Sequence, residues 1–76
     1  MDRIFELKLK AVDVFQLLDA LDIRAECYER TAAYLETGEM DEPFIIEEVS
    51  DAEEAREIAK HFRDVQAEIN KQIAES

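Results

Sequence analysis

The feature that most constrains the fold is a regular apolar repeat in the first half of the chain. Apolar side chains recur there at alternating steps of four and three residues: Val14, Leu18, Leu21, Ala25, Tyr28, Ala32 and Leu35. This spacing places them along one face of an α-helix, as in helices that pack against another helix. The repeat predicts a helix over residues 14–37, which ends at Gly38 because glycine adopts the left-handed conformation without a Cβ clash.

A second apolar row lies beside the first, so this helix has a wider apolar face than one helical partner requires. The row consists of Leu17, Ala20, Ile23, Cys27 and Tyr34. A chain of 76 residues buries little surface, and chains of this size are commonly stabilised by disulfides, metals or self-association. Because Cys27 is the only cysteine, no disulfide can form within the chain. We therefore expect the second row to form the interface of a homodimer or larger assembly, and the N-terminal segment over residues 3–10 is the other candidate to cover it.

The second half of the chain carries a narrower helical stripe. Its apolar residues are Ala55, Ile58, Phe62, Val65 and Ile69, again at steps of three and four. The stripe predicts a second helix over residues 51–74. Ser50 followed by Glu53 fits the capping box of a helix start, and Asp13 followed by Gln16 gives the first helix a similar signal.

The segments outside the helices are less regular. Residues 3–10 alternate, with Phe5, Leu7 and Leu9 on one side, which predicts a half-buried β-strand. Residues 44–49 are rich in residues that favour extended structure, and they fit either a second short strand or an extended loop.

Together these patterns predict a mainly α fold in a single domain over residues 1–76. The expected elements are the strand over 3–10, a helix over 14–37, an acidic connection over 38–49 and a helix over 51–74. A short connection favours an antiparallel helical hairpin. Its unpaired apolar row leads us to expect two hairpins to pack into a dimeric four-helix bundle.

Charge argues against several classes of function. The formal net charge is −11, whereas nucleic-acid binding needs a basic surface that releases counterions. The same charge disfavours anionic membranes. No apolar run reaches the length of a signal peptide or of a membrane-spanning helix. We expect a cytoplasmic protein that binds neither nucleic acid nor membrane.

The acids are concentrated in one stretch, Glu36–Glu54, which holds nine acidic residues and no Lys or Arg. Asp51, Glu53 and Glu54 suit the positive end of the second helix. The other six are candidates for a surface that docks a basic partner: Glu36, Glu39, Asp41, Glu42, Glu47 and Glu48. The simplest interpretation of these acids is a solvated, solubilising loop that also blocks edge pairing. The docking surface and a divalent-cation site are the alternatives to it, and the EF-hand pattern of a calcium site is absent.

No catalytic constellation is evident. His61 is the only histidine, and it lies beside the stripe of the second helix, where a surface position is expected. Cys27 lies in mid-helix without a neighbouring base, so we expect a small hydrophobic side chain rather than a nucleophile. We predict no enzymatic activity, no cofactor and no metal.

The sequence therefore predicts a small, acidic, self-associating module that binds protein, with an antagonist or regulator of a basic partner as one role. The alternative is a structural or assembly subunit whose acids serve only solubility.

Overall fold

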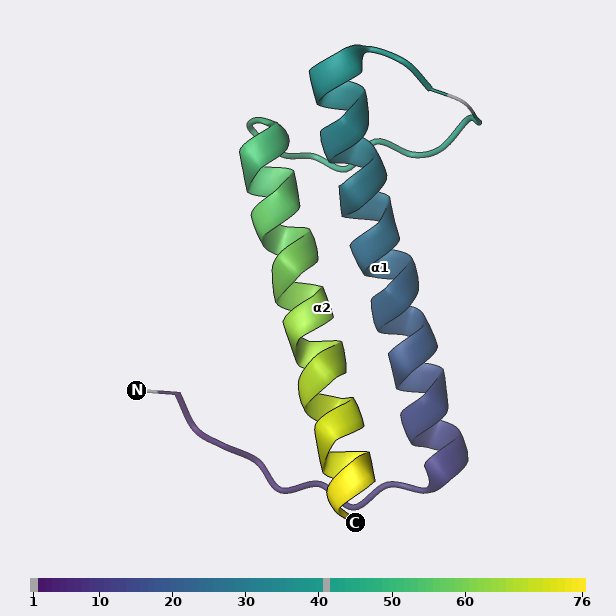
Figure 1. Ribbon diagram of the computed structural model, residues 1–76, viewed down its shortest axis with the longest axis vertical. Coiled ribbons are helices and arrows are strands. Elements are labelled where there is room, and N and C mark those ends of the chain that lie inside the picture. The colour runs from purple at the N-terminus through teal and green to yellow at the C-terminus, as the bar shows by residue number, and fades with distance from the viewer. Residues whose placement is uncertain (1, 41) are drawn as a thin grey trace.

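The structure, a computed structural model, describes residues 2–40 and 42–76. Its two helices are α1, Ala11–Thr37, and α2, Ala52–Glu75. They run antiparallel and pack against each other (Figure 1). The predicted mainly helical fold, with a helical hairpin, is therefore confirmed.

The two helices meet through small side chains. Ala25 and Ala55 are fully buried, and Ala32 and Ala59 are each 3% exposed. Most of the larger apolar residues of both stripes are only half-buried: Val14, Leu18, Leu21, Tyr28, Ile58, Phe62, Val65 and Ile69. Leu35, the last residue of the first stripe, is 44% exposed. Because alanine carries no side chain beyond Cβ, the helix axes can approach closely. The hairpin therefore gains close contact while burying few large side chains.

α1 begins three residues before the predicted start. Lys10 is the N-cap, and no side chain caps this end. The Lys10 carbonyl accepts hydrogen bonds from the backbone N–H groups of Asp13 at 3.0 Å and Val14 at 3.1 Å. The prediction that Asp13 is the cap was therefore wrong. Alanine at position 11 is a strong helix former, which favours the earlier start. This start places Asp13 inside the first turn, where a carboxylate still interacts favourably with the positive end of the helix dipole.

The other two helix ends follow the predicted chemistry more closely. Gly38 ends α1 with a φ of 73°, and its N–H donates to the Tyr34 carbonyl at 2.7 Å. At the start of α2 the cap is Asp51 rather than Ser50, because the Asp51 carboxylate accepts from the Glu54 N–H at 2.8 Å. The Glu54 carboxylate in turn accepts from the Ser50 N–H at 3.3 Å. The side-chain cap thus lies one residue later than predicted, and the returning bond from Glu54 goes to the residue before the cap.

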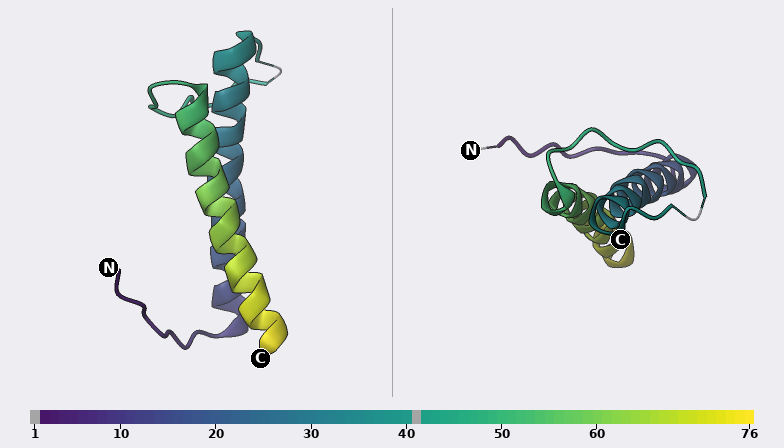
Figure 2. Two further views of the ribbon diagram at one scale, coloured as in Figure 1. Left: turned by 60° about the vertical axis from the view of Figure 1, so that its left-hand side comes forward. Right: turned by 90° about the horizontal axis from the view of Figure 1, so that it is seen from above.

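The segments outside the helices form no strand among residues 2–40 and 42–76. Residues 2–10, here called the arm, extend across the open end of the hairpin and past the end of α2 (Figures 1 and 2). Residues 44–49 form a loop, one of the two alternatives that the sequence allowed. The strand over 3–10 is not found in the single chain, and the four-helix bundle stays a prediction.

The capping geometry predicts different costs for two adjacent substitutions. Asp51→Ala removes the acceptor for the Glu54 N–H and should lower the free energy of unfolding by about 0.5–2 kcal/mol. Ser50→Ala should change it by less than about 0.5 kcal/mol, as for ordinary surface positions. Urea denaturation of both variants measures the difference. A larger loss for Ser50→Ala than for Asp51→Ala would contradict the observed cap.

Candidate interaction surfaces

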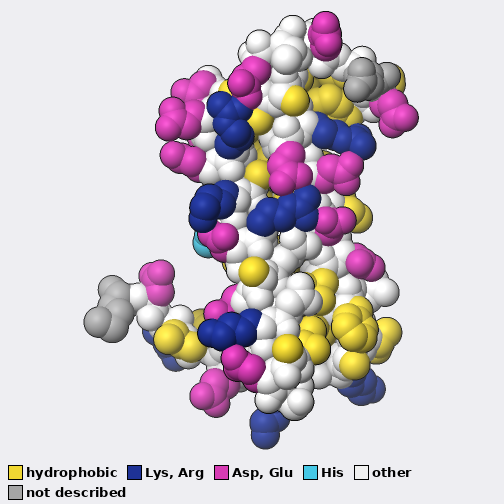
Figure 3. All heavy atoms as spheres, in the orientation of Figure 1, with side chains coloured by type: hydrophobic (Ala, Val, Ile, Leu, Met, Phe, Trp, Pro, Cys, Tyr) yellow, Lys and Arg dark blue, Asp and Glu magenta, His cyan; other side chains and the backbone are white. Residues whose placement is uncertain are grey.

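Large apolar side chains lie on the surface at the open end of the hairpin. In the arm, Ile4 is 92% exposed, Phe5 68% and Leu7 74%, and in the first turns of α1 Val12 is 60% and Phe15 54% exposed. Figure 3 shows a cluster of hydrophobic side chains at the lower right of this face, with charged side chains around it and over the upper half of the molecule. Contiguous exposed apolar surface of this kind is typical of interaction sites.

The arm and both helices enclose an apolar groove of about 360 Å³ at this end. Its apolar lining comprises Phe5, Leu7 and Leu9 from the arm, Val14 and Leu17 from α1, and Ile69 and Ile73 from α2. The groove therefore joins the apolar side of the arm to the ends of both helical stripes. Chemically it suits another apolar surface rather than a polar ligand.

The second apolar row divides into an exposed and a half-buried part. Leu17 is 48% exposed, Ile23 is 60% exposed, and Ala20 is also exposed. Cys27 and Tyr34 are half-buried. The first half of α1 thus offers more free apolar surface for a dimer interface than the second half does.

The acidic connection is fastened to α1 through Thr31 and Arg24. Thr31 is fully buried, and its hydroxyl donates to the Cys27 carbonyl at 2.8 Å and accepts from the Glu47 N–H at 3.1 Å. The Glu47 carboxylate accepts from Arg24 Nη1 at 2.7 Å. Glu47, one of the six candidate docking acids, therefore helps to hold the connection against α1.

The remaining candidate acids differ in how they are engaged. Glu36 pairs with Arg56 across the two helices. Glu39, Glu42 and Glu48 are exposed, and none forms an ion pair with the residues that the structure describes. Asp41 lies outside the described residues. Of the five described candidate acids, Glu39, Glu42 and Glu48 are therefore the ones that make no ion pair with the described residues.

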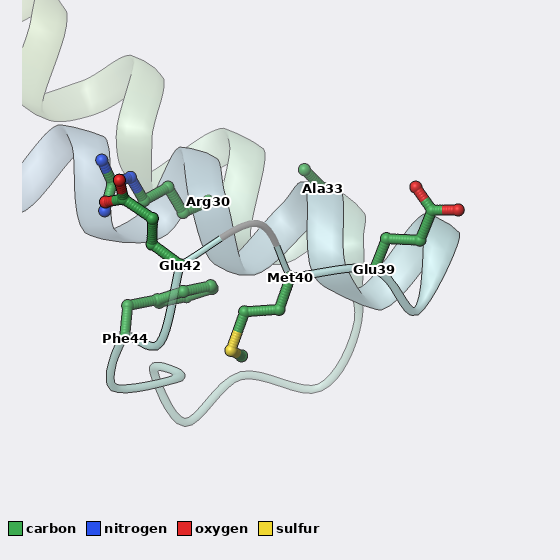
Figure 4. A pocket seen from close by; sticks show the side chains of 6 residues that line it. All are labelled: Arg30, Ala33, Glu39, Met40, Glu42 and Phe44. Carbon is green, nitrogen blue, oxygen red and sulfur yellow. The ribbon is translucent and has the colours of Figure 1, made fainter.

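A hollow of about 320 Å³ lies beside two of these acids. Arg30 and Ala33 of α1 line it together with Glu39, Met40, Glu42 and Phe44 of the connection (Figure 4). Its lining therefore mixes acidic, basic and apolar side chains, and in Figure 4 the Arg30 and Glu42 side chains extend toward the same side of the hollow.

Arg63 of α2 joins the two helices through several charged contacts. Its Nε and Nη2 donate to the two carboxylate oxygens of Glu29 at 3.1 and 2.8 Å, in a bidentate arrangement. Nη1 donates to Asp22 at 2.5 Å and to Gln66 at 3.0 Å. The Gln66 amide donates to the Leu18 carbonyl at 3.2 Å. This network fixes the register of the helices along their middle turns.

The network also shifts the pKa values of Glu29 and Arg63. The hydrogen bonds from Arg63 hold the pKa of Glu29 below its ordinary value of 4.5, against partial desolvation, which acts in the opposite direction. The hydrogen bonds to Glu29 and Asp22 likewise raise the pKa of Arg63. Arg63 therefore stays charged at every pH at which Glu29 titrates.

Other candidate chemistry is sparse in the described part of the chain. His61 is exposed. Among residues 2–40 and 42–76, no three His, Cys, Asp or Glu side chains lie close enough together to hold a metal ion. Neither described helix combines the length and apolar character needed to cross a membrane. Comparison with protein-family models, curated proteins and solved structures gives no match.

Sequence reasoning missed three residues that organise this surface: Arg24, Thr31 and Arg63. Their partners lie between 16 and 41 residues away in the chain, so no local spacing indicates them. The ion pairs at i,i+4, Arg30 with Glu26 and Lys60 with Asp64, are the kind that a sequence does reveal. For Thr31, the only indication in the sequence was that a threonine lies next to Ala32 of the first apolar row.

Replacing Thr31 tests how the connection is held. Thr31→Val keeps the shape but leaves the Glu47 N–H without its acceptor, which should cost about 1–3 kcal/mol. Thr31→Ser retains the hydroxyl and loses one methyl group, worth about 0.8 kcal/mol. Hydrogen exchange at the Glu47 amide should accelerate in Thr31→Val and not in Thr31→Ser. Equal exchange in both variants would show that the hydroxyl does not hold this amide.

The Glu29–Arg63 pair predicts a specific pH dependence. Because its pKa is lower in the folded state, Glu29 adds stability above its ordinary pKa of 4.5, and this contribution disappears as pH falls through the folded value. Glu29→Gln should therefore lower the free energy of unfolding near pH 7 and not at pH 2. Denaturation of both proteins across this range measures the gap. A gap that is independent of pH would contradict the assignment.

Proposed function

We propose that the protein is a cytoplasmic, self-associating module that binds other proteins. The observation that carries the proposal is the placement of its large apolar side chains. The buried apolar residues of the described chain are all alanines, whereas Ile4, Phe5, Leu7, Phe15 and Ile23 are each more than half exposed. Covering these side chains with protein would remove a large apolar surface from water, which favours association.

The total exposed surface supports the same proposal. A compact monomer of 8.8 kDa should expose about 4,800 Å², whereas the single chain exposes 6447 Å². The excess of roughly 1,700 Å² is about twice the 800 Å² that each partner buries in a typical stable interface. A typical interface with one further copy of the chain would therefore cover about half of the excess.

Mass measurement tests self-association directly. Light scattering behind a sizing column should give at least twice the chain mass at micromolar concentration. Ile23→Glu places a charge in the second apolar row and should lower the mass toward that of one chain. Ala67→Glu adds the same charge at an exposed position outside both apolar rows and serves as the matched control. A wild-type monomer with one sharp thermal transition would contradict the proposal.

A second, charge-directed function is favoured by one observation: Glu39, Glu42 and Glu48 are exposed and have no ion-pair partner within the described residues, whereas Glu36 and Glu47 do. Such a surface would dock a basic protein and serve an antagonist or regulator. Unlike charges accelerate association, and salt screens this effect within about 8 Å at physiological ionic strength. The alternative role is a structural or assembly subunit whose contacts depend little on salt.

The two roles are separated by a neutralised variant. Glu39→Gln, Glu42→Gln and Glu48→Gln together remove three charges and should slow binding of a captured basic partner and reduce its salt dependence. Asp19→Asn, Glu57→Gln and Glu75→Gln remove three exposed charges elsewhere and serve as the control. If both variants bind the partner at equal rates and with equal salt dependence, the charge-directed function is contradicted and the assembly role remains.

A further inference from the structure

The arm has the side-chain pattern of a β-strand but no strand beside it. Among the described residues, the main-chain groups of residues 3–9 make no backbone hydrogen bond to each other or to the helices. The Arg3 guanidinium lies 5.2 Å from the centre of the Phe5 ring, so residues two apart share a side, as they do in a strand. The arm thus exposes a row of unpaired donors and acceptors, which is a template for strand pairing.

The sequence of the arm is complementary to itself in one antiparallel register. When Leu7 lies opposite Leu7 of a second copy, each Glu6 faces a Lys8 and each Phe5 faces a Leu9. Opposite charges on facing strands stabilise the pair, and like charges destabilise it. Centring the pair on Glu6 or on Lys8 instead would oppose two like charges. Among these three registers, only the one centred on Leu7 opposes no like charges, and it places Ile4 opposite Lys10.

We propose that residues 4–10 of two copies pair as an antiparallel β-ribbon with its two-fold axis at Leu7. The inference rests on the proposed self-association and specifies the surface that produces it. The pairing is the same on both copies, so it closes into a dimer rather than extending into a fibre. The arm projects past α2 (Figure 2), which leaves its main chain open to a second molecule.

The groove at the open end provides an apolar surface on which the ribbon could pack. A two-stranded ribbon is marginal in water unless it packs on a helix or another apolar surface. Phe5, Leu7 and Leu9 already line the groove together with Leu17 of α1 and Ile73 of α2. The apolar side of the ribbon would therefore face the helices, while Glu6 and Lys8 would lie on the solvent side.

Exchanging the two charges tests the register. Glu6→Lys opposes two lysines in each pair and Lys8→Glu opposes two glutamates, so each variant alone should raise the dimer dissociation constant roughly tenfold or more. When the two variants are mixed, a dimer with one copy of each places a Lys opposite a Glu at both positions. Such mixed dimers should form with nearly wild-type affinity. The double variant, Glu6→Lys with Lys8→Glu, should also recover wild-type affinity. Light scattering and circular dichroism report mass and helix content for each sample.

A disulfide provides an independent measurement. In a Cys27→Ser background, Leu7→Cys places two cysteines opposite each other with Cα atoms about 4.5–5.5 Å apart, within the range for a disulfide. Oxidation should give a covalent dimer. Arg3→Cys is the control, because its two copies lie about 26 Å apart along the ribbon, and it should cross-link much less.

The outcomes separate this inference from the proposed function. A wild-type protein that is monomeric overturns both. A wild-type dimer whose affinity is unchanged in the single charge variants, or is not restored by mixing them, overturns the ribbon and leaves self-association standing. Equal cross-linking of Leu7→Cys and Arg3→Cys would also overturn the ribbon.

Discussion

The close contact of two helices through alanine is the constraint on which the rest of the structure depends. Ala25, Ala32, Ala55 and Ala59 are the buried apolar residues of the described chain. Buried apolar area stabilises at about 25 cal/mol per Å², so four small side chains contribute far less than four leucines would. The larger apolar residues are displaced to the flanks of this contact and to the open end of the hairpin, where they become available to another chain.

Charged contacts compensate in part for the small apolar core. Arg24, Arg56 and Arg63 each connect segments that are distant in the sequence. Exposed ion pairs contribute little individually, although bidentate geometry and networks strengthen them. Their chief effect here is on specificity: they fix the register of the helices and hold Glu47 against α1. The acidic stretch is therefore heterogeneous, with some carboxylates serving the fold and others left on the surface.

The sequence predicted what depends on local periodicity. The repeat of α1, the stripe of α2 and the glycine at position 38 were sufficient for both helices and for the hairpin. The cap of α2 lies at Asp51 and not at the predicted Ser50, because both side chains are able to cap a helix. α1 begins earlier than predicted, because Ala11 and Val12 extend the helix toward the N-terminus. The contacts of Thr31 and Arg63 depend on how the two helices are aligned, which periodicity alone does not determine. For the arm, alternation predicts a strand, but a strand requires a partner that one chain does not contain.

If the arms pair as proposed, the main-chain groups of residues 4–9 become hydrogen-bonded only when two chains meet. Hydrogen exchange of the amides over residues 4–10 tests this most directly, because paired strands protect every second amide on the side that faces the partner. The account predicts alternating protection that increases with protein concentration, while amides in the middle of α1 and α2 stay protected throughout. Uniformly fast exchange over residues 4–10, at concentrations where the mass is that of a dimer, would contradict it.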